Sequence, residues 1–136
     1  MKYNLELIQY INHFEKITNT QVKDCFFEEE KLIFIVNPGQ ASKAVGKNGV
    51  NAKKFVSQTN KRIKITEFNE DPIKFINSLI SPIKAEEITL ENKLVKIKVN
   101  ATKDKGLLIG RNSKNLENLK KVVQKYFQDI EDIKII

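Results

Sequence analysis

The segment Ala44-Val-Gly-Lys-Asn-Gly49 has an imperfect copy, Leu108-Ile-Gly-Arg-Asn-Ser113, about one small module further along the chain. Each segment ends in a tetrad, Gly46–Gly49 or Gly110–Ser113, that lies where a short predicted helix is followed by a longer one. A Gly-x-x-Gly turn between two helices lets the backbone approach a nucleic-acid phosphate, and a cation inside the turn suits an anionic guest. Two such turns in one basic chain therefore indicate a tandem binder of single-stranded nucleic acid, with RNA favoured.

The positive charge of the chain is concentrated around these two tetrads. The 136 residues include 24 Lys and Arg against 17 Asp and Glu, which gives a net charge of +7. No acidic residue occurs from Lys31 to Thr66, and Asp104 is the only one between Lys93 and Leu116. The clustering predicts a polyanionic partner, although lysines that merely solvate the surface remain the alternative.

The sequence gives no support to an enzyme. Cys25 is the only cysteine, so an intrachain disulfide and a Cys-based zinc cage are excluded, and it falls on a predicted strand as a small buried hydrophobe. His13 is the only histidine, and no lysine with Ser or Thr follows Gly49 as a P-loop requires. The acidic residues show no metal-ligand spacing. We expect no catalytic residue, metal, cofactor or small-molecule substrate.

Membrane association is not indicated either. No apolar stretch reaches the roughly 20 residues that a membrane span needs. The N-terminal residues are amphipathic and include acid, unlike a secretory signal. We expect a cytoplasmic protein without a membrane partner.

Hydrophobic periodicity and turn residues predict a fixed order of elements in the first half of the chain. Asn4 can cap the first helix. Phe26 and Phe27 lie on the first strand, where alternation places one of them in the core. The expected elements are a helix at 4–16, strands at 22–28 and 32–36, a short helix at 40–45, a helix over 52–59 and a strand at 62–68.

The same order then begins again. Asp71 and Pro72 are typical of a helix start, and Ser81-Pro82 ends that helix. The expected elements are a helix to residue 80, strands at 83–90 and 93–100, a short helix at 104–109, a long helix over 116–127 and a strand at 133–136. The repetition predicts an α+β fold (an α/β sandwich) of two domains, 1–69 and 70–136. Asn48 and Asn51 recur as Asn112 and Asn115.

At the level of these motifs the chain resembles a known family. The matching stretches are Tyr10-Ile-Asn-His-Phe-Glu15, Val22-Lys-Asp-Cys25, Ala44-Val-Gly-Lys-Asn-Gly49 and Lys105-Gly-Leu-Leu-Ile-Gly110. They resemble tandem type II KH domains, the prokaryotic form of that RNA-binding fold. More narrowly, the whole chain resembles the short archaeal NusA proteins, which consist of two KH domains. The resemblance implies that each domain is a three-stranded mixed sheet covered by helices on one face.

The resemblance also implies a groove that holds about four nucleotides. Val45 and Val50 would form its apolar floor in the first copy, and Leu108 and Ile109 in the second. Turn amides and the start of the following helix would receive phosphate. The expected RNA-binding residues are Gly46, Lys47, Asn48, Gly49, Lys43 and Lys53 in the first copy and Gly110, Arg111, Asn112, Ser113, Lys105 and Lys114 in the second.

Ser113 departs from the family pattern, which has glycine at this position. A Cβ penalises a positive φ and crowds a close backbone approach. The serine hydroxyl could instead cap the following helix or donate to a phosphate. The first tetrad is therefore the firmer site.

The resemblance implies an RNA-binding transcription factor. Like its relatives it would bind single-stranded nascent RNA and RNA polymerase and modulate pausing, termination or antitermination. Two alternatives stay open, a ribosome-associated or ribosome-assembly KH protein and a protein-interaction module whose KH units have lost RNA binding.

Overall fold

The structure is a computed structural model that describes residues 4–136, and the chain divides into two compact units, Met1–Asn69 and Glu70–Ile136. We call them the first and second units. The first contains α1 (Leu5–Thr18), β1 (Val22–Glu28), β2 (Lys31–Val36), α2 (Ala41–Val45), the 3₁₀ turn η1 (Lys47–Gly49), α3 (Val50–Thr59) and β3 (Arg62–Glu67). The second contains α4 (Pro72–Ile80), β4 (Glu87–Glu91), β5 (Leu94–Lys98), α5 (Thr102–Ile109), the 3₁₀ turn η2 (Arg111–Ser113), α6 (Lys114–Tyr126) and β6 (Asp132–Ile135).

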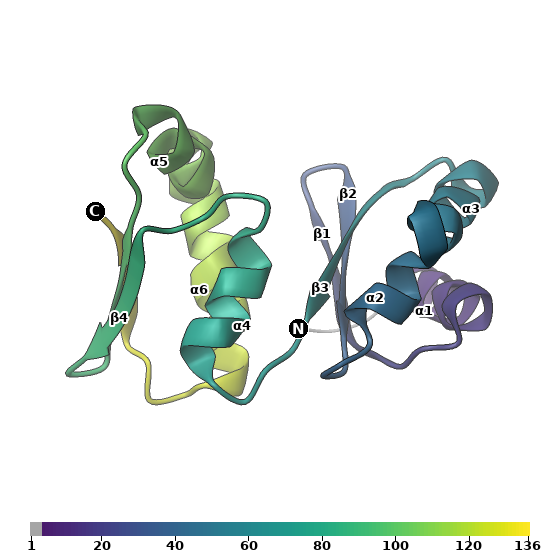
Figure 1. Ribbon diagram of the computed structural model, residues 1–136, viewed down its shortest axis with the longest axis horizontal. Coiled ribbons are helices and arrows are strands. Elements are labelled where there is room, and N and C mark those ends of the chain that lie inside the picture. Colours follow the sequence, from purple (N-terminus) through teal and green to yellow (C-terminus); the bar gives the residue numbers. More distant parts are fainter. Residues whose placement is uncertain (1–3) are drawn as a thin grey trace. The chain divides into compact units, whose positions relative to one another are not determined.

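Each unit contains one three-stranded mixed sheet, which confirms the predicted α+β class (Figure 1). The order is β1-β2-β3 in the first unit and β4-β5-β6 in the second. In both, the first two strands are antiparallel and the last pair is parallel. A parallel pair requires a crossover connection, and the two helices joined by the tetrad turn supply it. Along the chain, each tetrad therefore lies in the connection between the middle strand and the last strand of its sheet.

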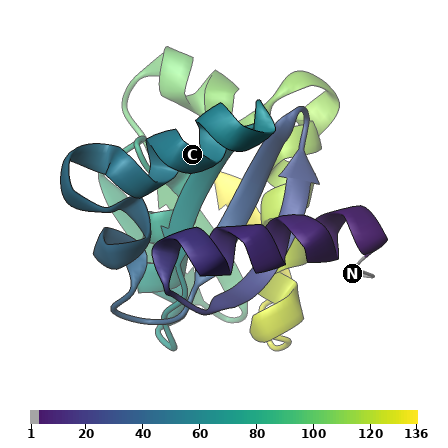
Figure 2. The same ribbon diagram turned by 90° about the vertical axis from the view of Figure 1, so that its right-hand side faces the viewer.

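The first helix begins and ends where local side chains satisfy its free backbone groups. The Asn4 side chain accepts a hydrogen bond of 2.8 Å from the Leu7 amide, as predicted for a cap. Asn19 ends the helix in the left-handed conformation, with φ 54°, and its amide donates to the Glu15 carbonyl. The helix therefore extends two residues beyond its predicted end. Figure 2 shows α1 crossing over the strands of its unit.

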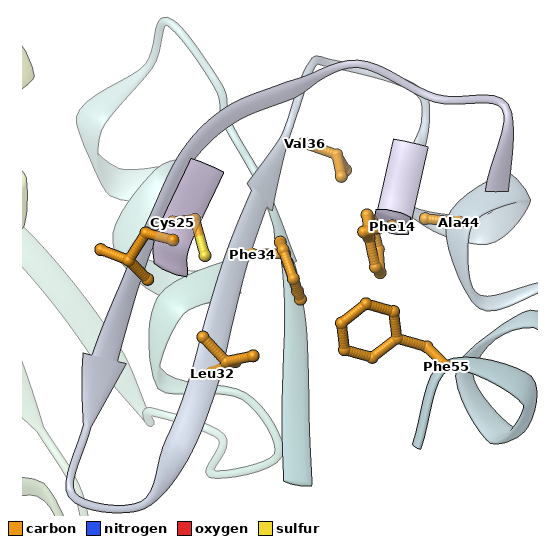
Figure 3. Packing of buried hydrophobic residues seen from close by; sticks show 8 residues of the cluster. Phe14, Cys25, Leu32, Phe34, Val36, Ala44 and Phe55 are labelled. Carbon is orange, nitrogen blue, oxygen red and sulfur yellow. The ribbon is translucent and has the colours of Figure 1, made fainter. Parts of the chain in front are cut away.

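An aromatic cluster joins the helices of the first unit to one face of its sheet (Figure 3). Phe14 of α1 stacks on Phe34 of β2 with ring centroids 4.0 Å apart. Phe55 of α3 meets both rings edge-on, at 5.6 and 5.4 Å. Burial of each ring contributes about 1.5–3 kcal/mol. The cluster holds α3, the helix that follows the first tetrad, against the sheet.

The first strand departs from simple alternation. The pairing of β1 with β2 shifts register between Val22 and Asp24, and both Asp24 and Cys25 are buried. Phe27 faces the helices, where its ring meets Tyr10, but it remains 37% exposed. The prediction that one of the paired phenylalanines lies in the core is wrong, because Phe27 lies near the end of the strand. The prediction of a buried Cys25 is confirmed.

The second unit begins as predicted but its strands are shorter. The Asp71 side chain accepts a hydrogen bond from the Ile73 amide, and Pro72 is the first helical residue. The strand predicted at 83–90 starts only at Glu87, because the chain after α4 first forms turns that link the Ser81 and Ile83 amides to carbonyls of α4. The strand predicted from Lys93 starts at Leu94, since Lys93 lies in the hairpin turn with φ 66°.

Two sets of contacts hold α6 in the second unit. Phe75 of α4 meets Tyr126 and Phe127 with centroids 6.0 Å apart in each case. Lys120 of α6 forms an ion pair of 2.8 Å with Asp132 of β6, and this hydrogen bond lowers the pKa of the Asp132 carboxyl.

Between residues 4 and 136, no helix has both the length and the apolar character that a membrane crossing demands.

Candidate nucleic-acid interface

The first tetrad forms a tight turn between α2 and α3. Gly46 ends α2 with φ 81° and ψ 165°, a conformation that is essentially restricted to glycine. Asn48 and Gly49 are then both left-handed, with φ 56° and 74°. The Gly46 amide donates to the Ser42 carbonyl and the Gly49 amide donates to the Gly46 carbonyl, at 2.9 and 3.0 Å. The turn is thus closed by its own backbone.

The second tetrad has the same backbone despite its serine. Gly110 has φ 76° and ψ 172°, Asn112 has φ 55° and Ser113 has φ 59°. The Gly110 amide donates to the Gly106 carbonyl at 2.8 Å, and the Ser113 amide donates to the Gly110 carbonyl at 3.2 Å. A Cβ at the fourth position therefore does not change the turn.

The hydrogen bonds of the turns narrow the set of amides that a phosphate can use. The Val50 amide donates to the Lys47 carbonyl, and the Lys114 amide donates to the Arg111 carbonyl. None of the bonds that close the first turn uses the amides of Lys47 and Asn48. These central amides, rather than those of the whole tetrad, are the donors available to a phosphate oxygen.

Ser113 does not act as the helix cap that its side chain suggested. It occupies the N-cap position of α6, but in the described part of the chain its hydroxyl makes no capping hydrogen bond. A capping residue needs an extended backbone so that its side chain can reach the following amides, whereas Ser113 is left-handed. Ser113 is also exposed, which leaves it accessible to a ligand.

The side chains predicted for the first site gather at the turn. Lys43, Lys47, Asn48 and Lys53 are all exposed. The Lys53 side chain lies beside the turn, since its Cε would be 3.7 Å from a Cβ added to Gly49. The exposed ammonium groups give this turn a cluster of positive charge, the kind of surface that attracts a polyanion.

The second site is less cationic. Arg111, Asn112 and Lys114 are exposed next to the turn, whereas Lys105 is half-buried within α5. Glu117 lies one turn into α6 and forms an ion pair with Lys120 at 3.4 Å. The predicted residues are therefore present at the turn, but an acid accompanies them.

Of the residues predicted to form the apolar floor, those of the first unit are exposed, whereas one of those in the second unit is buried. Val45 is 37% exposed and Val50 is 56% exposed, so both can contact a ligand. In the second unit Leu108 is only 7% exposed, because it takes the core position that Ala44 occupies in the first. The prediction that Leu108 lines the groove is wrong, and the half-buried Ile109 is the counterpart of Val45.

The residues that sequence reasoning missed are the asparagines behind each turn. The Asn51 side-chain amide donates to the Lys43 carbonyl, and that of Asn115 donates to the Leu107 carbonyl, both at 3.0 Å. A Cβ added to Gly46 would lie 3.0 Å from the Asn51 side chain, and at Gly110 the distance to Asn115 is 2.7 Å. The signal was the recurrence of both asparagines at one offset from their tetrads.

The reactive side chains of Cys25, His13 and Lys64 do not suggest a second site within the described residues 4–136. Burial, with a smaller effect of Asp24, raises the pKa of the Cys25 thiol to about 12, which opposes a nucleophilic role. The His13 ring packs on Phe55 with centroids 5.5 Å apart. Burial also lowers the pKa of Lys64, partly offset by Glu28, so this lysine does not resemble the solvated cations of the turn.

Comparison with known proteins identifies relatives over the whole chain. It is 31% identical to the probable transcription termination protein NusA of Methanocaldococcus jannaschii, with 100% of this chain and 75% of the relative covered. It is 30% identical to the protein of the same name from Methanococcus vannielii, over 100% of this chain and 80% of the relative. The chain belongs to the archaeal NusA family.

More distant members of the archaeal NusA family align over a similar span. The Halococcus morrhuae protein is 25% identical over 94% of this chain and 93% of its own length. The crystal structure of APE1850 is similar with a TM-score of 0.70 and 31% identity, over 98% of this chain and 100% of that one. No family model matches the chain. The two-domain KH-like architecture is therefore one that this NusA-family chain shares with a solved structure.

Proposed function

We propose that this archaeal NusA-family protein is a transcription factor that binds single-stranded nascent RNA through its two tetrads. By holding RNA it modulates pausing, termination or antitermination by RNA polymerase, which is its second partner. The archaeal relatives are named as transcription termination proteins rather than as enzymes.

The observation that carries the proposal is the duplicated turn. Two segments of different sequence adopt the same sequence of glycine-type and left-handed backbone conformations. Each presents an exposed cation, Lys47 or Arg111, beside a central amide that the turn does not use. The left-handed conformation costs free energy for residues with a Cβ such as Asn48, Asn112 and Ser113, so its repetition supports a functional requirement rather than a simple helix connection.

The charge at the first turn supports a phosphodiester ligand over a protein surface. Lys43, Lys47 and Lys53 are exposed around one turn, and no acid lies between Lys31 and Thr66. Phosphate neutralisation by these groups would release counterions from RNA, so affinity should fall steeply as salt rises. The exposed Val45 and Val50 supply apolar area against which a base can pack.

The test replaces Lys47 and Asn48 by Asp in the full chain. A fluorescein-labelled, short single-stranded RNA of random sequence is titrated at low and at physiological salt, with fluorescence anisotropy as the readout. We expect a loss of affinity of at least about tenfold and a weaker salt dependence, because two acids then face the phosphates. The control is Asn77→Asp with Lys84→Asp, the same change in charge at two exposed positions in and after α4.

An unchanged affinity in a folded Lys47→Asp, Asn48→Asp variant would refute the RNA-binding site. Isolation of the tagged protein from native cells then distinguishes the candidate functions by the partners that are recovered. Recovery of RNA polymerase subunits supports transcription. Recovery of ribosomal subunits instead would contradict the transcription assignment and support the ribosome-associated alternative, and protein partners without RNA would support an interaction module.

A further inference from the structure

We propose that Asn51 and Asn115 are positioning residues, each of which locks its tetrad in the phosphate-receiving conformation before RNA arrives. The inference rests on the proposed function and deepens it, since it assigns the preformed geometry to a side chain outside either tetrad. It also implies that the second tetrad is competent to bind phosphate in spite of Ser113.

The geometry places each asparagine as a bridge between the two helices of the turn. Asn51 lies in the first turn of α3, and its side-chain nitrogen is 3.0 Å from the Lys43 carbonyl in α2. Lys43 precedes the glycine at which α2 ends, so the hydrogen bond crosses the tetrad from one helix to the other. A bond of this kind fixes the angle at which the two helices leave the turn.

The same side chain explains why the first tetrad residue is glycine. Any Cβ at Gly46 would meet the Asn51 side chain and backbone amide at 3.0 Å, closer than ordinary contact allows. The asparagine thus fills the space that a side chain at Gly46 would need. Gly46 and Asn51 therefore depend on each other, because the missing side chain at Gly46 leaves room for the hydrogen bond from the Asn51 side chain to the Lys43 carbonyl.

The second unit repeats the bridge where the tetrad sequence is weaker. Asn115 donates to the Leu107 carbonyl at the same distance of 3.0 Å, and its side chain lies 2.7 Å from the place of a Cβ on Gly110. Ser113 is left-handed, which disfavours the turn relative to glycine. Because the turn nevertheless matches that of the first unit, the bridge offsets the unfavourable serine.

The experiment uses Asn51→Leu and Asn115→Leu, which keep the size of the side chain but remove its donor. Asn77→Leu on the exposed surface of α4 is the matched control. Without RNA, we expect faster hydrogen exchange at the Gly49 amide in the first variant and at the Ser113 amide in the second. Circular dichroism should show that each variant remains folded.

RNA binding supplies the second readout, measured with the same labelled random RNA. Asn51→Leu should weaken binding by about fivefold, the ratio that corresponds to the loss of one ordinary hydrogen bond. Asn115→Leu is measured in the Lys47→Asp, Asn48→Asp background, where the remaining affinity reports on the second unit, and should lower that remainder by a similar factor.

The outcomes separate this inference from the proposed function. Unchanged exchange at the Gly49 and Ser113 amides in the folded leucine variants would overturn the positioning role, whatever the RNA result. Faster exchange with unchanged affinity would also overturn it, because the turn would then not need to be preformed. A wild-type protein that binds no RNA would refute the proposed function, and exchange would still decide whether the asparagines fix the turns.

Discussion

Replacement of Gly110 by Ala should destabilise the second unit more than any conservative change in the surrounding helices. Gly110 combines φ 76° with ψ 172°, a region that residues with a Cβ avoid. An added Cβ would lie 2.7 Å from the Asn115 side chain, a distance at which one of the two groups must move. The alanine variant must therefore strain its backbone and also displace Asn115 from its bond to the Leu107 carbonyl.

The magnitude follows from three contributions. Backbone strain in this region costs about 1–3 kcal/mol. Loss of the Asn115 hydrogen bond costs about 1 kcal/mol. Replacement of Gly by Ala also lowers the entropy of the unfolded chain, which stabilises the folded protein by about 0.4–1 kcal/mol and offsets part of these costs. The net expectation is a loss of about 1–4 kcal/mol in the free energy of unfolding.

Gly106 gives a matched control within the same helix. It lies inside α5, it lacks a positive φ, and an added Cβ would meet nothing within 4 Å. Gly106→Ala should therefore stabilise the protein by about 0.5–1 kcal/mol through helix propensity alone. The same chemical change four residues apart is expected to have opposite signs.

Urea unfolding followed by circular dichroism measures both variants against the wild type. Hydrogen exchange resolved by peptide assigns the change to the second unit, since a chain of two units does not have to unfold in one step. A wild-type urea midpoint for Gly110→Ala would contradict the expected loss of stability, and so would a Gly106→Ala variant destabilised as strongly as Gly110→Ala.

Two further predictions concern the first unit. Gly49→Ser recreates the residue found at Ser113; it should cost only about 1 kcal/mol and preserve RNA affinity within about threefold, because its Cβ makes ordinary contact with Lys53. Thermal unfolding and anisotropy check this, and a tenfold loss of affinity would contradict it. The Cys25 thiol should resist a disulfide reagent at mildly alkaline pH until denaturant is added, because its pKa is raised to about 12. The unfolded thiol ionises near its ordinary pKa of 9.0, whereas the folded thiol keeps its proton, so Cys25 should lower the free energy of unfolding as the pH rises from about 9 towards 12. Urea titrations at several pH values should show a weaker dependence of stability on pH in Cys25→Ala.

Local signals were sufficient to predict most of the fold. Asn4 and the pair Asp71-Pro72 mark helix starts through capping chemistry that depends only on neighbouring residues. Repetition of the element order predicted two domains, and the family resemblance predicted a mixed sheet in each of them. Where neighbours in sequence determine the structure, the sequence pattern was a sufficient guide.

The errors arose where distant contacts decide the outcome. Alternation placed one of the paired phenylalanines in the core, but Phe27 lies near the end of β1 and remains 37% exposed, so how much of its ring is covered depends on the helices packed over the sheet. Leu108 looked like a groove residue because it precedes the tetrad, yet the packing of α5 directs it into the core. The bridge from Asn115 to the Leu107 carbonyl joins two helices through space, and no periodic pattern reports such a bond.

The two turns share their backbone but not their charge, and this decides how each would contribute to RNA binding. Lys43 and Lys53 flank the first turn, whereas the equivalent positions in the second unit hold Leu107, which is 53% exposed, and Glu117. Counterion release scales with the number of phosphates that are neutralised, so the proposed RNA-binding role predicts that the salt-dependent share of the affinity belongs mainly to the first unit. A turn with the same amides but fewer cations retains directional hydrogen bonds that salt screens less. The net charge of +7 therefore does not predict how much each unit would contribute to RNA affinity, since similarly basic units differ in where their cations lie relative to the turn.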